Sequence, residues 1–200
     1  RSTQFEWPKA TGAIFHEALH ARYSQWDILK AQKDLSAAEF RAMILLEEGR
    51  IERQGLEIYP ENAGFLRACI LQIVMADMDD EPLPENGVRA AAALAALTLA
   101  RVDAGSVEEE DVTGLRAAVL KQLSEETLNK LRSIWLSAQE YDKHYMGEGL
   151  YDLAREWVRV VNEAAGNEED EEGEGQPGGM SAQDIQDILD ALGEAAENAE

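Results

Sequence analysis

The sequence predicts a mainly α-helical protein with little or no sheet. Apolar residues recur at helical spacing through most of the chain, and runs typical of β-strands are almost absent. Helix-start signals stand at Ser36 and at Ser124. With 200 residues, 45% of them hydrophobic, the chain is long enough for one globular domain and a tail.

The expected helices follow one another along the body of the chain. Residues 3–7 read as an extended lead, and a first helix follows Pro8 and runs to Trp26. Ser36 and Glu39 have the spacing of a capping box, so a second helix starts at Ser36 and ends near Ile58, before a proline. Further helices are expected over 62–78, over 88–102 and over 150–164, with a loop at 79–87. One more helix is expected to start from a cap at Ser106, with Glu109 at the capping-box position. Another is expected to start at Ser124 or Thr127 and to end near His144.

Negative charge is concentrated at the end of the chain. Eighteen Lys and Arg stand against forty Asp and Glu, a net charge of −22. Residues 160–200 hold thirteen of the acids and no base, so residues 1–159 carry only −9. We therefore expect a helical domain over 1–165, an acidic, glycine-rich, disordered linker over 166–180, and a short amphipathic helix with a tail over 181–200.

Composition excludes several classes of protein. The acidic balance argues against binding to nucleic acid or to anionic membranes, and no apolar run approaches the roughly 18 residues of a membrane span. A single cysteine, Cys69, excludes an internal disulfide and a zinc site built from cysteines alone. We expect a cytoplasmic protein, and the first residue, Arg1, suggests a piece of a longer or processed chain.

The strongest chemical signal is the sequence His16-Glu17-Ala18-Leu19-His20, which has the pattern H-E-x-x-H. Residues four apart share one face of a helix, so both imidazoles can bind one ion. Zinc accepts imidazole nitrogen in tetrahedral geometry and keeps a position for water. Glu17, about 100° further round the helix, would accept a proton from that water as general base.

A third protein ligand is expected from the next helix. Glu47 falls in the middle of that helix's apolar face, where an unpaired carboxylate would be costly and metal binding would remove the cost. Glu48 is the rival ligand, because Glu52 stands one turn later and could orient a ligand histidine. The sequence ranks Glu47 narrowly above Glu48, and it leaves open whether Arg50 neutralises this acidic cluster or is an ordinary exposed arginine.

The remaining histidine is a candidate for a different role. Zinc peptidases need a donor that stabilises the oxyanion of the tetrahedral intermediate, and His144 or Tyr145 could supply it. The alternative for His144 is an exposed histidine at the end of a helix.

The segments FHEALHARYS and LLEEGRIERQ, followed by helices and an acidic linker, resemble the zinc metallopeptidases associated with von Willebrand A domains. Those proteins are similar in architecture to the cobalt-chelatase T subunit. The resemblance covers about residues 10–60. It implies a zincin-like (gluzincin-like) helical domain in which His16 and His20 are ligands, Glu17 is the base, and Glu47 or Glu48 is the third ligand. This sequence differs in having no von Willebrand A domain and almost no sheet before the zinc helix.

Three functions follow as expectations. The first is a zinc-dependent metallopeptidase, a hydrolase acting on a protein or peptide substrate. The second is a non-catalytic, zinc-stabilised helical scaffold in a larger assembly with a von Willebrand A domain or an ATPase partner. The third is an acidic helical interaction module in which the H-E-x-x-H sequence binds no metal.

Overall fold

The computed structural model describes residues 3–24, 27–76, 87–141 and 148–166. Within these ranges the protein is mainly helical and contains no strand, which confirms the predicted fold class at that level. No helix in the described ranges combines the length and the apolar character needed to cross a membrane.

Eight α-helices and three shorter helical turns make up these ranges. The α-helices are α1 (Thr3–Tyr23), α2 (Ile28–Asp34), α3 (Ala37–Ile58), α4 (Ala63–Cys69), α5 (Val88–Ala104), α6 (Thr113–Gln122), α7 (Glu125–Gln139) and α8 (Glu148–Ala164). The 3₁₀ turns η1 (Pro60–Asn62) and η3 (Glu109–Val112) precede α4 and α6, and the π-helical turn η2 (Ile70–Val74) follows α4.

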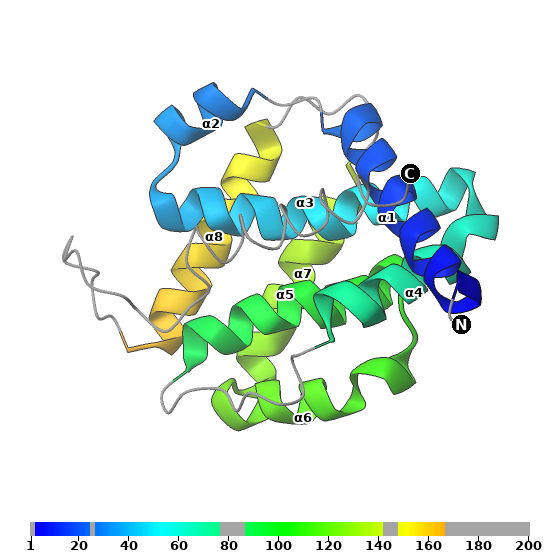
Figure 1. The fold of residues 1–200 in the computed structure, drawn as a ribbon. Coiled ribbons are helices and arrows are strands. Elements are labelled where there is room, and N and C mark those ends of the chain that lie inside the picture. The colour runs from blue at the N-terminus through cyan, green and yellow to red at the C-terminus, as the bar shows by residue number, and fades with distance from the viewer. Residues whose placement is uncertain (1–2, 25–26, 77–86, 142–147, 167–200) are drawn as a thin grey trace.

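Helix α3 forms the centre of the molecule (Figure 1). It packs against α5, α7 and α8, and its C-terminal half also meets α1. The core between these helices includes Met43, Leu46, Leu131, Trp135 and Trp157. Because α3 has neighbours on several sides, its buried residues include charged ones: Glu47, Glu48, Arg50 and Glu52.

Two glycines let α1 approach its neighbours closely. A Cβ on Gly12 would lie 2.0 Å from the backbone oxygen of Phe65 and 2.7 Å from Cβ of Cys69, so α1 and α4 are in direct backbone contact there. A Cβ on Gly55 of α3 would lie 2.5 Å from Cδ2 of Leu19. These contacts fix where α1 lies, and therefore where its histidines meet α3.

Several predicted boundaries are confirmed. Ser36 and Glu39 form the capping box, and α3 ends at Ile58. The Ser124 side chain caps α7 by accepting a hydrogen bond from the backbone of Thr127. Helices α5 and α8 lie within two residues of the expected ranges.

Other predictions at the helix ends were wrong. Residues 3–7 are not an extended lead, because α1 already begins at Thr3 and includes Pro8. A proline this near the start removes only one helical hydrogen bond, and no described strand is present to pair with an extended segment. Ser106 caps no helix. The turn η3 starts at Glu109, and the backbone N–H of Glu108 just before it donates to Asp111.

Further helices differ from the expectation. Helix α2 lies where no helix was predicted, and Asp27 caps it by accepting from two backbone N–H groups. The helix expected over 62–78 is divided into η1, α4 and η2 and ends at Val74. Helix α7 ends at Gln139, short of the predicted end near His144. Most of the 79–87 loop, nearly all of the linker and the 181–200 helix lie outside the described residues.

The contact at Gly12 predicts a large effect from one methyl group. In Gly12→Ala the new methyl meets the backbone of α4, which cannot move without separating the helices. We expect the free energy of unfolding to fall by about 1–3 kcal/mol. The matched control is Gly64→Ala, because nothing lies within 4 Å of a Cβ at Gly64. This variant should be neutral or more stable by up to about 1 kcal/mol. Chemical denaturation followed by circular dichroism measures both, and equal values for the two variants would contradict the close approach.

Candidate metal centre

Two histidines of α1 face α3. His16 and His20 are one turn apart, so their rings share one side of the helix. The ring centroids are 4.8 Å apart and the planes are nearly perpendicular. His16 is 3% exposed, whereas the side chain of His20 is 24% exposed. The site is therefore closed around His16 and more open around His20.

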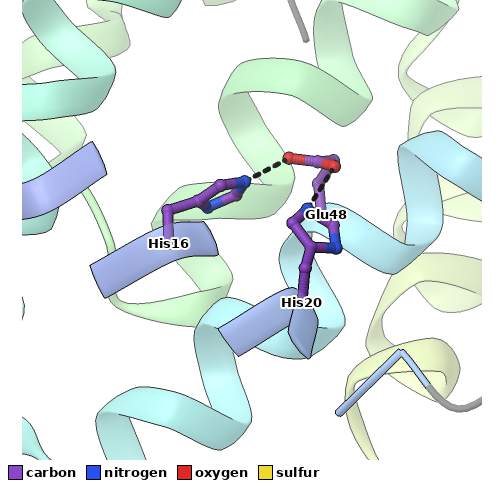
Figure 2. Close-up of side chains that lie close together, drawn as sticks. All are labelled: His16, His20 and Glu48. Atoms are coloured by element: carbon purple, nitrogen blue, oxygen red, sulfur yellow. Dashed lines mark ion pairs between the residues drawn. The ribbon is translucent and has the colours of Figure 1, made fainter. Parts of the chain in front are cut away.

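Glu48 of α3 completes a group of three. Its Oε2 lies 3.2 Å from Nε2 of His16, and its Oε1 lies 3.3 Å from Nε2 of His20. Figure 2 shows this carboxylate beside both rings. One ligand atom from each residue lies within 4.8 Å of the others. Two imidazole nitrogens and a carboxylate are ligands that zinc accepts, with a fourth position left for water.

The two Nε2 atoms lack hydrogen bonds. Both are buried, and neither makes a hydrogen bond with a described residue despite lying close to Glu48. Buried polar atoms are rarely left in this state. A divalent cation placed between the rings and Glu48 would satisfy both nitrogens at once, so the residues present fit a metal ion.

The opposite ring nitrogens are held by acidic partners, in one case through a serine. Nδ1 of His16 lies 3.3 Å from Oε1 of Glu52. Nδ1 of His20 lies 3.0 Å from Oγ of Ser24, which in turn donates to Glu47 over 2.7 Å. Metal-binding histidines usually donate their other N–H to such a partner, because this fixes the tautomer and the ring orientation. Glu52 therefore occupies the orienting position that its spacing from Glu48 suggested.

An arginine from a third helix binds both Glu48 and Glu52. Arg101 of α5 is 2% exposed and donates to Glu48 over 2.9 Å and to Glu52 over 2.9 and 3.2 Å. Buried carboxylates need such compensation, because their isolated charge is costly in a low-dielectric interior.

Burial and charge change the protonation of these residues in opposite directions. Burial disfavours the imidazolium of His16, but the carboxylates of Glu48 and Glu52 outweigh burial and raise its pKa to about 10. Burial also disfavours the charged form of Glu48, yet His16 and His20 hold its pKa well below the usual range. In Glu52, Arg101 and His16 overcome the same cost and lower the pKa. Without metal, the cluster is therefore an ion-paired network.

The structure places Glu48, and not Glu47, beside the imidazoles, which reverses the order expected from the helical wheel. Glu47 is buried at 1% exposure, as its position predicted. Its charge is compensated by Arg50, which donates to it over 2.6 and 2.8 Å, and by Ser24. Arg50 is therefore no ordinary exposed arginine. The ranking from the helical wheel assumed one buried face. Helix α3 is covered on several sides, so the face that carries Glu48 is buried as well.

The side chains predicted to take part in catalysis are not among the three grouped donors. Glu17 is half-buried on the next face of α1, outside the group formed by the two histidines and Glu48. Glu17 also affects Cys69 of α4. Burial, together with the negative charges of Glu52 and Glu17, raises the pKa of the Cys69 thiol to about 11. His144 and Tyr145 lie outside the described residues.

Sequence reasoning missed Ser24 and Arg101. Ser24 is four residues after His20, a spacing that could have signalled a contact with its ring. Arg101 follows the uncharged, alanine-rich segment AAALAALTLA, and a charged residue directly after such a run suggests a buried partner. Nothing in the sequence indicated which acid that partner would be.

The raised pKa of His16 predicts a pH-dependent contribution to the stability of the metal-free protein. The pKa of His16 in the folded protein lies above the value of about 6.5 that an unperturbed histidine has in the unfolded chain. Protonated His16 therefore stabilises the fold fully below about pH 6.5, and this stabilisation is lost as the pH rises toward about 10. In chelator-treated protein, NMR of the imidazole nitrogens should show His16 still protonated at pH 8. Titration of His16 near pH 6.5 would contradict the ion-paired network.

The chain was compared with models of known protein families, with curated proteins and with solved structures, and none of the three comparisons gave a match.

Proposed function

We propose that the protein is a zinc-dependent hydrolase that cleaves peptide bonds, with His16, His20 and Glu48 as the metal ligands. The observation that carries this proposal is the pair of buried Nε2 atoms that lack hydrogen bonds and lie next to one carboxylate. The tethers on both Nδ1 atoms support it, because they turn each Nε2 toward the shared point.

The chemistry follows from this donor set. Zinc held there would polarise a substrate carbonyl and make its water ligand more acidic. Glu17, next to His16 in the H-E-x-x-H sequence, would take the proton from the attacking water and pass it to the leaving amine. His20 is the more exposed ligand, so substrate would approach from its side.

A second candidate is a zinc-stabilised helical scaffold without catalysis, for example within a von Willebrand A or ATPase assembly. Two observations favour it. His16 and Glu48 are almost fully buried, and no strand among the described residues could hold a peptide in extended form. In this function the metal would only join α1 to α3.

Metal content tests the site that both candidates share. We expect about one zinc per chain in wild type and in Glu47→Gln, whose amide oxygen still accepts the hydrogen bond from Ser24, and a loss of zinc in Glu48→Gln and His16→Ala. Glu47 and Glu48 are adjacent, buried and alike in size, so this pair separates ligation from general damage to α3. Elemental analysis after dialysis measures the content. Zinc retained by Glu48→Gln, or absent from wild type, would contradict the assignment.

Substitution of Glu17 distinguishes catalysis from a scaffold. Glu17→Gln keeps the shape of the side chain but cannot accept a proton as a carboxylate does. We expect it to retain zinc and to lower peptide hydrolysis by about 10²–10⁴-fold, the range of general-base catalysis. Cleavage of a fluorogenic peptide library measures the rate, and Glu57→Gln, on the exposed end of α3, is the control. Equal rates in Glu17→Gln and wild type would rule out this mechanism, whereas zinc without any turnover would favour the scaffold.

A further inference from the structure

We propose that Arg101 is a positioning residue for the metal centre, which presents Glu48 to the ion through one oxygen and holds Glu52 against His16. This inference rests on the proposed function, because it concerns the same candidate site. It adds a residue from a third helix, far from the H-E-x-x-H sequence in the chain, to the machinery of that site.

The guanidinium of Arg101 is fixed by all three of its nitrogens. Nε donates to Glu52, one terminal nitrogen donates to Glu48, and the other donates to the backbone oxygen of Leu97 over 2.9 Å. The side chain is 2% exposed, so water does not compete for these bonds. A rigid fork of this kind can set the orientation of two carboxylates at once.

The two oxygens of Glu48 differ in their contact with Arg101. Oε2 accepts the hydrogen bond from Arg101 and also lies 3.2 Å from Nε2 of His16, while Oε1 lies 3.3 Å from Nε2 of His20 and receives no hydrogen bond from Arg101. Because Oε2 already shares its electron density with Arg101, Oε1 is the oxygen of Glu48 better able to bind a metal ion. Arg101 thus favours binding of the ion through one oxygen of Glu48 and disfavours binding through both.

Charge supports the same role. Glu48 and Glu52 together bring two negative charges into the interior, and Arg101 offsets one of them. The ion then meets two neutral imidazoles and one net negative charge. Without Arg101, Glu52 would lose its partner on α5 and could turn away from His16 or toward the ion.

A simple repulsion between cations makes the opposite prediction. If Arg101 acted only through its positive charge, its removal would strengthen the binding of zinc. If it acts by positioning, removal weakens binding despite the gain in negative charge. On removal, the sign of the change in affinity separates the two roles; in a substitution that keeps the charge, only the positioning role predicts a change.

The experiment compares the two buried arginines that each bind a glutamate of α3. Arg101→Lys and Arg50→Lys both keep the charge and lose the fork, but only Arg101 contacts Glu48 and Glu52. Zinc affinity is measured by competition with a chelating dye, and the geometry of the site is measured from the visible absorption of the cobalt-substituted protein. We expect Arg101→Lys to bind zinc about 10–100-fold more weakly and to show an altered cobalt spectrum. Arg50→Lys should keep the wild-type spectrum.

Each outcome bears on the proposal. Unchanged or tighter zinc binding in Arg101→Lys, or an equal spectral change in Arg50→Lys, would overturn the positioning role and leave the metal site intact. Failure of wild type to bind zinc or cobalt would instead overturn the proposed function. Glu52→Gln, which keeps Arg101 but weakens its second contact, is the companion variant if Arg101→Lys does not fold. We expect it to weaken zinc binding about 10-fold or more and to change the spectrum, and an unchanged affinity would overturn the proposal.

Discussion

The central constraint in this protein is that helix α3 carries three carboxylates into the interior. Glu47, Glu48 and Glu52 are all buried, and an uncompensated charge there would cost more than a typical fold can supply. Each therefore has a partner from another part of the chain or from α3 itself. Arg50 and Ser24 compensate Glu47, and Arg101 compensates both Glu48 and Glu52.

The position of α1, which is fixed by close packing at two glycines, brings two histidines to these carboxylates and creates the candidate site. Close approach at Gly12 and Gly55 brings α1 against α4 and α3, which leaves His16 and His20 next to the acidic face of α3. Nδ1 of each ring contacts Glu52 or Ser24, whereas both Nε2 atoms lie beside Glu48 without a hydrogen bond. Within the described residues, the group of His16, His20 and Glu48 is where buried ring nitrogens remain unsatisfied in a form that a cation would complete.

The proposed function rests on the chemistry of that group of side chains. Two imidazoles and a carboxylate favour zinc, and the glutamate beside His16 favours hydrolysis, whereas deep burial and the lack of a described strand favour a scaffold. These candidates share one metal site and differ in what Glu17 does. The site and the chemistry can therefore be tested separately.

Much of this protein was determined by local sequence. The helical fold class, the capping box at Ser36, the cap at Ser124 and the shared face of His16 and His20 depend on residues within a few positions of one another, and each appears in the structure. The choice between Glu47 and Glu48 was different. Both acids are buried on a helix that is covered from several sides. Arg50 of the same helix binds Glu47, and only the placement of α1 and α5 decides that Ser24 joins it there while His16, His20 and Arg101 meet Glu48. Apart from Arg50, these partners are distant from the two acids in the chain, so helical periodicity could not identify them.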